Sequence, residues 1–289
     1  MFLLLTVPLM PIQALAVSFN LSLKRYLPHW YHRLVCRLLS VRVHLSGAPI
    51  AAGPVLIVSN HISWLDIPVL SSVAPLSFVA KSEVSTWPFI SALARLQRTL
   101  FIDRTRRSAV AETRNQILER LKEKERIVLF AEGTSSDGNQ VLPFKSPLFA
   151  AVEANGTNGD GYMLQTCAIV YTQIYGLPMN RQQRPAIAWY GDMDMLSHAW
   201  GVLKGGPLDV RVRFGEPVAV SSVGDRKKLA THAYERVRVD FSQLLTGRSR
   251  KAHGAAESAD AARRPASSRL ERFDETRPHQ DLWLPDERL

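Results

Sequence analysis

The sequence predicts an α/β domain built around a single mixed, mostly parallel sheet that is flanked by helices. The first observation is that short runs rich in β-branched residues alternate with stretches of helical spacing from about Val41 onward. Such alternation is typical of a sheet whose parallel strands are joined by helices. The second is composition, because 289 residues that are 46% hydrophobic suffice to bury one substantial core.

The individual elements follow from these patterns. Seven short apolar runs are predicted as strands: Val55–Ser59, Leu76–Ala80, Thr99–Ile102, Ile127–Ala131, Leu164–Tyr171, Ala186–Tyr190 and Val210–Phe214. Five stretches with apolar residues three or four positions apart are predicted as helices: Ile67–Val73, Val84–Leu96, Arg106–Lys124, Pro147–Glu153 and Arg226–Leu245. Pro68 indicates that the first helix begins near Asp66, because proline is favoured in the first helical turn.

The amino-terminal segment differs from the rest of the chain. No charged residue occurs from Met1 to Leu23, a length sufficient to cross a bilayer, although Pro8 and Pro11 would interrupt a smooth helix. The following residues, Lys24–Leu39, have apolar positions at helical spacing among basic ones, which is typical of a helix lying on a membrane surface. Residues 1–45 are therefore predicted to form an apolar membrane anchor and a basic amphipathic helix.

Two other interpretations of this segment stay open. A removable signal peptide would fit the sequence Ala14-Leu15-Ala16, but no Lys or Arg precedes Lys24, whereas signal peptides begin with a positive region. A buried core helix is the other. If the segment is an anchor, basic residues and aromatics such as Trp30 follow it directly. This composition predicts that the following segment lies at the cytoplasmic face of the inner membrane. The active site is then expected on the same side.

The rest of the chain divides into a folded body and a tail. Residues 46–246 hold all the predicted strands and helices, whereas residues 247–289 are rich in Arg, Ala, Ser and acidic residues and are predicted to be disordered. Of 36 Lys and Arg and 26 Asp and Glu, nine and eight lie from Arg248 onward, so the body carries nearly all of the net charge of +10. A basic body suits an anionic membrane, acidic ligands or nucleic acid. The sequence shows no nucleic-acid-binding module, so no nucleic-acid partner is predicted.

Neither a disulfide framework nor a metal site is predicted. The two cysteines, Cys36 and Cys167, do not form a CxxC pair, which fits a reducing compartment. No H-E-x-x-H motif or other convincing ligand set occurs in the sequence.

The stretch from Ser59 to Asp66 carries the candidate catalytic pair. His61 would lie in the turn after the strand Val55–Ser59, with Asp66 at the start of the next helix. Because residues five apart on a continuous helix point about 140° apart, only the turn can fold the imidazole onto the carboxylate. The carboxylate would fix the tautomer, so that the other ring nitrogen can take a proton from an alcohol. The alternative is a capping role for Asp66, with His61 a polar turn residue.

Two later segments supply candidate binding residues. Arg104 follows the strand Thr99–Ile102, and its guanidinium matches phosphate oxygens. After the strand Ile127–Ala131 come Glu132, which would hold Arg104 or an acceptor hydroxyl, and the pair Gly133-Thr134, where backbone N–H groups can meet an anion. Lys145, just beyond, is a further candidate for contact with a phosphate or the donor. Taken singly, each is equally compatible with a solvated charge or a simple turn.

Together these segments resemble the glycerophospholipid acyltransferases, which acylate glycerol-3-phosphate, lysophosphatidic acid and related lyso-lipids. The resemblance covers roughly Pro54–Pro217. The N-H-x4-D block of that family is matched by Asn60, His61 and Asp66, and its G-x-x-F-I-x-R block by Phe101, Ile102 and Arg104, with Arg98 at the usual glycine. Its F-P-E-G-T-x-S block is matched by Phe130, Glu132, Gly133, Thr134 and Ser136, with Ala131 in place of proline. Its fourth block, an apolar strand with a proline, is similar to Leu164–Tyr171, with Thr166 at the proline position.

The resemblance leaves the acceptor open. In the family the second and fourth blocks help to shape the acceptor side, so Arg98 and Thr166 depart from the pattern of enzymes that convert 1-acyl-sn-glycerol-3-phosphate to phosphatidic acid. The stretch Ala188–Asp194 with His198 is similar to a bacterial branch that includes lyso-ornithine lipid acyltransferases. His198 itself is interpreted as a structural histidine and not as a second base.

The resemblance implies direct acyl transfer at a membrane. His61, oriented by Asp66, would deprotonate the acceptor hydroxyl as it attacks the thioester of acyl carrier protein or coenzyme A. Arg104, Glu132, Gly133, Thr134, Asn60 and Lys145 would bind substrate. No cofactor and no acyl-enzyme are predicted, since no G-x-S-x-G elbow occurs in the sequence. The oligomeric state is left open. The alternative of another class is a non-catalytic lipid-binding protein on the same fold.

Overall fold

A computed structural model describes residues 2–102, 107–150, 152 and 161–247. Arg104 and residues 248–289 of the predicted tail lie outside the described residues. The described part contains a nine-stranded sheet in which seven strands follow the order β1-β8-β6-β2-β5-β3-β4. From one edge to the other these are Val41–Gly47, Leu208–Phe214, Met163–Ile174, Val55–Ser59, Arg126–Phe130, Ser77–Lys81 and Leu100–Ile102. The short strands β7 (Leu177–Pro178) and β9 (Val218–Ala219) also pair with β6.

The sheet is mixed and mostly parallel, as the sequence predicts. Strands β6, β2, β5, β3 and β4 run parallel to one another. Strand β8 is antiparallel to β6, and β1 is parallel to β8. The carboxyl ends of the five parallel strands therefore share one edge of the sheet, where α/β folds place their binding sites.

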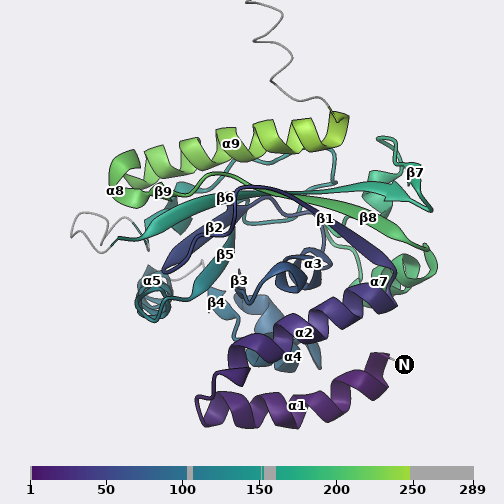
Figure 1. The fold of residues 1–289 in the computed structure, drawn as a ribbon, viewed down its shortest axis with the longest axis horizontal. Helices are drawn as coiled ribbons and strands as arrows, with labels where there is room; N and C mark the ends of the chain where they lie inside the picture. Colours follow the sequence, from purple (N-terminus) through teal and green to yellow (C-terminus); the bar gives the residue numbers. More distant parts are fainter. Residues whose placement is uncertain (1, 103–106, 151, 153–160, 248–289) are drawn as a thin grey trace, which may run out of the picture. The chain divides into compact units, whose positions relative to one another are not determined.

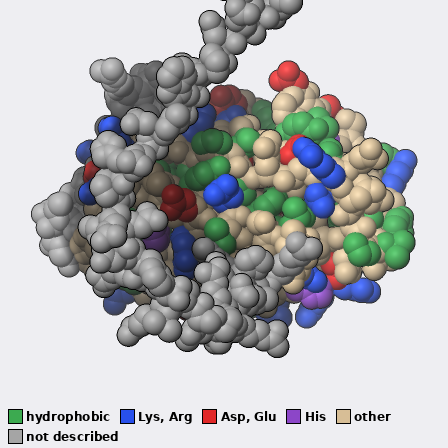
Figure 2. Space-filling view, turned by 90° about the horizontal axis from the view of Figure 1, so that it is seen from above, with side chains coloured by type: hydrophobic (Ala, Val, Ile, Leu, Met, Phe, Trp, Pro, Cys, Tyr) green, Lys and Arg blue, Asp and Glu red, His purple; other side chains and the backbone are tan. Residues whose placement is uncertain are grey.

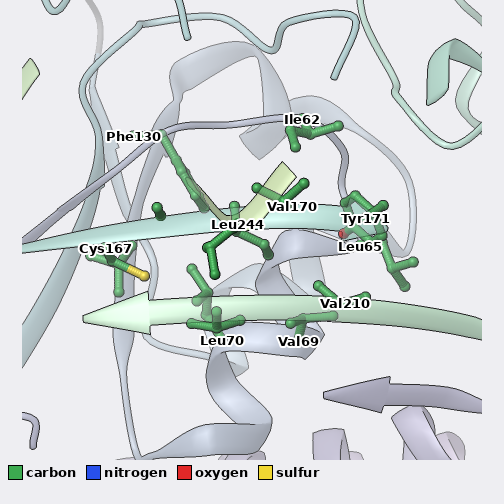
Figure 3. Close-up of a cluster of buried hydrophobic side chains, with 14 of the residues drawn as sticks. Ile62, Leu65, Val69, Leu70, Phe130, Cys167, Val170, Tyr171, Val210 and Leu244 are labelled. Atoms are coloured by element: carbon green, nitrogen blue, oxygen red, sulfur yellow. The ribbon is translucent and has the colours of Figure 1, made fainter. Parts of the chain in front are cut away.

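Both faces of the central strand β2 are covered. Val55 and Ile57 pack in a cluster that includes α3 (Asp66–Val73), whereas Leu56 and Val58 pack in a second cluster that includes α5 (Arg107–Lys122) and α9 (Arg226–Thr246). Alternate residues of a strand face opposite sides, so a continuous apolar run is what a sheet buried on both faces requires. Figure 1 shows α9 on one side of the sheet and α3 on the other, and Figure 3 shows Val69 and Leu70 of α3 near Val210 of β8.

Most predicted elements are confirmed, and the exceptions have physical reasons. The segment Ala186–Tyr190 was predicted as a strand, which is wrong: it contains the end of a 3₁₀ helix, Arg184–Ala186, and a loop. Its apolar residues Ile187 and Ala188 are buried by packing without strand pairing. The predicted helix Val84–Leu96 divides into a 3₁₀ helix, Ser82–Thr86, and α4, Ile90–Leu96, with Pro88 between them. Strand β1 and helix α7 (Met195–Lys204) are not among the predicted elements.

The predicted helix Pro147–Glu153 is described only in part, and its described residues Ala150 and Val152 are helical. A 3₁₀ helix covers Ser146–Phe149, and residues 151 and 153 lie outside the described residues. Both cysteines, Cys36 and Cys167, are free and buried, and burial raises the pKa of each thiol.

Two helices precede the sheet. Helix α1 covers Phe2–Ser18 and continues through Pro8 and Pro11, so the expected interruption at these prolines is wrong. Helix α2, Leu23–Leu38, corresponds to the predicted basic helix. Within the described residues, no helix has both the length and the apolar character that a bilayer crossing needs. Helix α1 contacts α2 and α4 and lies beyond α2 from the sheet (Figure 1).

Candidate active site

His61 and Asp66 meet in the turn that joins β2 to α3. Strand β2 ends at Ser59 and α3 begins at Asp66, so the imidazole folds back toward the start of the helix. The Nδ1 atom of His61 lies 2.7 Å from Oδ2 of Asp66. A carboxylate accepts hydrogen bonds, so Nδ1 carries the proton and Nε2 is the nitrogen that can accept one. The geometry that the sequence predicts for this pair is therefore present.

The carboxylate of Asp66 is held by four donors. Besides His61, the backbone N–H groups of Ile62 and Ser63 donate to Oδ2 over 2.7 and 3.0 Å, and the hydroxyl of Tyr171 donates to Oδ1 over 2.7 Å. The side chain is fully buried. Asp66 thus closes the turn, as the capping alternative expects, and orients the imidazole at the same time.

The imidazole remains accessible to a substrate. The side chain of His61 is 18% exposed, and its ring stacks on Phe130 with ring centroids 4.0 Å apart. Phe130 is the last residue of β5 and pairs with Ser59 of β2. Stacking fixes the plane of the ring, and the bond to Asp66 fixes its rotation, so that Nε2 is directed by two independent contacts.

Glu132 lies directly behind the histidine turn. Its Oε1 accepts a hydrogen bond from the backbone N–H of His61 over 3.2 Å. Among the described residues its Oε2 has no partner, and the side chain is 1% exposed. Burial raises the pKa of this carboxyl to about 9, so Glu132 is uncharged at neutral pH. Its predicted pairing with Arg104 lies outside the described residues.

We expect Glu132 to leave a signature in the pH dependence of stability. A carboxyl whose pKa rises from 4.5 to about 9 on folding is protonated in the folded chain and ionised in the unfolded chain between these values. The free energy of unfolding should therefore fall as pH rises through this range. In Glu132→Gln this fall should become smaller, by the amount that the release of about one proton on unfolding contributes. Denaturant unfolding at several pH values measures it. Glu235→Gln, at an exposed position of α9, is the control, and an equal change in both variants would contradict the assignment.

The remaining predicted binding residues differ in their exposure to solvent. Asn60 was predicted to bind substrate, but it is fully buried, and its amide exchanges two hydrogen bonds of 2.9 and 3.0 Å with the backbone of Ile169. It ties the end of β2 to β6, and its role in binding substrate stays a prediction. Gly133 adopts φ +75°, and its N–H donates to the carbonyl of Phe130. Thr134 and Lys145 are exposed, and the backbone N–H of Lys145 donates to the carbonyl of Ala131 over 2.9 Å.

Two of the three departures from the family pattern, Arg98 and Thr166, lie away from the histidine turn, whereas Ala131 directly follows Phe130. Arg98 precedes β4, at the amino edge of the parallel strands, whereas His61 follows the carboxyl end of β2. It adopts φ +63°, the conformation for which glycine is favoured, and its side chain pairs with buried Glu125. Thr166 is buried within β6 opposite Val58. Neither residue therefore informs the choice of acceptor.

The loop before α7 packs against the histidine turn. The backbone N–H of Trp189 donates to the carbonyl of Ile62 over 2.9 Å, and the indole of Trp64 donates to Nδ1 of His198 over 3.1 Å. Nδ1 of His198 therefore accepts the indole N–H of Trp64, and the structural role of His198 stays a prediction. This loop is the part of the chain that the sequence connects with lyso-ornithine lipid enzymes, and the structure places it beside the catalytic turn.

Tyr171 is the residue of the site that sequence reasoning missed. It was predicted only as the end of a strand, yet its hydroxyl donates to Asp66 from a fully buried ring. Figure 3 shows Tyr171 beside Leu65, at the end of the sheet where α3 begins. The available signal was chemical, because a tyrosine in a buried strand needs a partner for its hydroxyl.

Tyr171→Phe is expected to reduce turnover without changing substrate binding. Removing the hydroxyl leaves Oδ1 of Asp66 short of one donor, which should lower the free energy of unfolding by about 1–3 kcal/mol and loosen the imidazole. We expect kcat to fall while the KM values of donor and acceptor stay constant, measured by steady-state kinetics. Tyr162→Phe is the matched control, since the Tyr162 hydroxyl is buried and has no partner among the described residues. A KM effect alone would contradict this positioning role.

The fold and site place a histidine–carboxylate pair at the carboxyl edge of a mixed sheet, and comparison with known proteins identifies the family. A sequence profile described as Acyltransferase matches residues 40–170. The lyso-ornithine lipid O-acyltransferase of Brucella abortus is 44% identical over 246 residues, which cover 84% of this chain and 92% of that protein. The 1-acyl-sn-glycerol-3-phosphate acyltransferase of Neisseria meningitidis is 31% identical over 192 residues, 66% of this chain and 71% of that protein.

The crystal structure of the 1-acyl-sn-glycerophosphate acyltransferase from Thermotoga maritima has the same fold, with a TM-score of 0.52 at 21% identity over 75% of this chain and 78% of that chain. The chain belongs to the lysophospholipid acyltransferase family. It is an O-acyltransferase of the lysophospholipid type, and its substrates include lipids.

Proposed function

We propose that the chain transfers an acyl group from a thioester to the hydroxyl of a lyso-ornithine lipid, with His61 as the general base. The observation that carries the chemistry is the bond of 2.7 Å between His61 Nδ1 and buried Asp66. The acceptor rests on the 44% identity to the Brucella lyso-ornithine lipid enzyme and on the similar loop, Ala188–Asp194, beside the catalytic turn. Lysophosphatidic acid is the second candidate, which the 31% identical Neisseria enzyme supports.

The reaction needs one proton relay. Nε2 of His61 takes the proton of the acceptor hydroxyl as its oxygen bonds to the thioester carbonyl carbon. The tetrahedral intermediate carries a negative oxygen, which backbone N–H groups near the turns would stabilise. As the carbon–sulfur bond breaks, Nε2 gives this proton to the leaving thiolate, which departs as a thiol. Asp66 stabilises the imidazolium throughout, because it accepts the hydrogen bond from Nδ1.

The binding roles are proposals of the same kind. Arg104 would pair with the polar head of the acceptor, beside Glu132, Gly133 and Thr134, and exposed Lys145 would meet the donor or a phosphate. The donor would be an acyl carrier protein or coenzyme A thioester, and no cofactor or metal enters the reaction. The basic body would attract either acidic donor.

Helix α1 is the proposed membrane contact. Its buried positions include polar residues: Thr6 shares a hydrogen bond of 2.8 Å with Tyr31, and the amide of Gln13 donates to the carbonyls of Lys24 and Leu96. Two of its leucines are exposed, Leu4 by 80% and Leu15 by 57%. A helix that buries polar residues and exposes leucines is suited to dip into lipid. We place it at the cytoplasmic face of the inner membrane, since basic residues follow it.

Replacing these leucines should release the protein from membranes. Leu4→Ser combined with Leu15→Ser removes two side chains whose burial in lipid is worth about 1.5–3 kcal/mol each, so membrane partitioning should fall about 100-fold or more. Flotation with lipid vesicles measures it. Leu45→Ser, which removes a leucine that is also 57% exposed on β1, is the control. Equal partitioning of both variants would contradict the contact.

A panel assay tests the proposed function. Purified protein receives a labelled acyl thioester and separate lyso-lipid acceptors, and mass spectrometry identifies the acylated product. We expect lyso-ornithine lipid to give the highest kcat/KM. A higher kcat/KM for lysophosphatidic acid would identify that lipid as the acceptor and would leave the proposed acyl transfer unchanged. Transfer to no lyso-lipid by folded protein would contradict the proposal and favour a lipid-binding role on the same fold.

A further inference from the structure

A basic cavity lies at the edge of the sheet opposite His61. It has a volume of about 190 Å³, several times the roughly 30 Å³ that one water occupies in the liquid. The start of α2, the amino ends of β3 and β5 and the turn before β4 enclose it. Its charged lining residues are five cations and one acid: Lys24, Arg25, Arg98, Lys124, Arg126 and Glu125. Since His61 follows the carboxyl end of β2, this cavity is separate from the catalytic turn.

The single acid of the cavity is already engaged by three guanidinium groups. Glu125, 3% exposed, pairs with Arg98, with Arg120 over 3.4 Å and with Arg25 over 3.6 Å. One carboxylate neutralises one positive charge, so the group formed by Glu125 and its three arginine partners keeps a net positive charge. Glu123 lies 3.8 Å from Arg25, but its carboxylate is largely exposed, where an ion pair is weak.

The lysines add to this excess. The Lys24 ammonium donates to the side-chain oxygen of Asn20, which is uncharged. Burial and the neighbouring Arg98 guanidinium lower the pKa of Lys24, and the Glu123 and Glu125 carboxylates offset this lowering only in part. Lys124 is exposed at the mouth of the same cavity. The cavity is therefore a concave site with uncompensated positive charge.

Exposed apolar side chains lie in the chain segment next to the cavity residues Lys24 and Arg25. Phe19, Leu21 and Tyr26, around the turn between α1 and α2, are 69%, 50% and 47% exposed, and Tyr26 itself lines the cavity. Exposed apolar side chains next to clustered cations are what the boundary between lipid tails and head groups requires. A soluble anion would need only the cations.

We propose that this cavity binds a phosphate group, supplied by the head group of an anionic membrane lipid. Arg25 and Arg98 offer guanidinium forks, and Lys24 and Lys124 offer ammonium charges, so that the phosphate completes the charge balance around Glu125. The bound lipid fixes the turn between α1 and α2 against the bilayer. The site is distinct from the acceptor site, and it holds a lipid that is not consumed.

The test uses the full chain and a pair of charge variants. Lys24→Gln/Lys124→Gln removes two cations that have no recorded carboxylate partner among the described residues and leaves the Glu125 network intact. Lys227→Gln/Lys228→Gln removes the same charge from exposed positions at the start of α9. That side of the sheet is seen in Figure 2, where Lys and Arg side chains are interspersed with apolar and neutral ones. Binding is measured to vesicles of phosphatidylcholine with and without phosphatidylglycerol, and separately to inorganic phosphate. No acyl donor is present, so the result does not depend on transfer.

The cavity variant should bind phosphatidylglycerol vesicles about 30-fold more weakly, at about 1 kcal/mol for each cation near the surface. The control variant should change by less than about threefold. Competition by inorganic phosphate at constant ionic strength would support the lipid head group as the source of the phosphate. Loss of phosphate binding in the cavity variant with unchanged vesicle binding would support a free phosphate as the ligand. Equal weakening in both variants, or no binding of either probe by the unmodified protein, would overturn the proposal.

Discussion

His61→Ala is expected to lower kcat by about 10²–10⁴-fold, the largest effect of any single substitution in this chain. The substitution removes the atom that takes the proton from the acceptor hydroxyl, whereas the donor and acceptor contacts remain. The KM values should therefore change little. The carboxylate of Asp66 keeps its three other donors when the imidazole is removed, so the fold should be retained. Steady-state kinetics on the purified variant measures the effect, with unfolding as a check on the fold.

The chain contains its own control for this substitution. His44 also pairs with an aspartate, Asp209, over 2.6 Å, but it lies on β1 with a side chain that is 56% exposed. His44→Ala removes an equivalent histidine–carboxylate pair away from the catalytic turn and should leave kcat unchanged. If the two variants lost activity to the same extent, the assignment of His61 as the base would fail.

Asp66→Asn is expected to cause the second largest loss, again about 10²–10⁴-fold in kcat. An amide cannot accept all four of the hydrogen bonds that reach this carboxylate, because one of its two terminal atoms is itself a donor. The imidazole would then lose its fixed tautomer. The free energy of unfolding should fall as well, by about 1–3 kcal/mol, because Ile62, Ser63 and Tyr171 donate to the same side chain.

Asp209→Asn provides the comparison. It alters the partner of His44 on β8 and should affect kcat little. Measuring kcat and unfolding together separates the two effects of Asp66→Asn, because a variant that is only less stable would regain activity at lower temperature. Recovery of full turnover under such conditions would contradict the orienting role of Asp66.

A continuous buried run is the clearest signal that the sequence offers. Strand β2 is buried along its whole length, so its composition alone identifies it. Strand β1 lies at the edge of the sheet and is largely exposed, so it lacks a continuous apolar run, although its first five residues alternate apolar and polar. Helix α7 exposes Leu196 and Trp200, which obscures its helical periodicity. The run Ala186–Tyr190 is apolar because a loop is buried there, and composition cannot distinguish this from a strand.

The catalytic pair could be predicted because its members are five residues apart and one turn joins them. The supporting contacts could not, because they cross the sheet. Tyr171 reaches Asp66 from 105 positions away, and Asn60 is fixed by Ile169 from 109 positions away. Asn60 matched a family motif and was assigned to the substrate, whereas its environment shows that the motif also preserves the joint between β2 and β6.

Chemical rescue by imidazole tests the central claim most directly. His61→Gly leaves space beside Asp66, Phe130 and the acceptor hydroxyl, into which a free imidazole can diffuse. The account predicts that acyl transfer by this variant is lost without imidazole and returns in part as imidazole is added, and that Asp66→Asn in the same variant prevents the return. Turnover by folded His61→Gly within tenfold of the unmodified protein, without added imidazole, would contradict it.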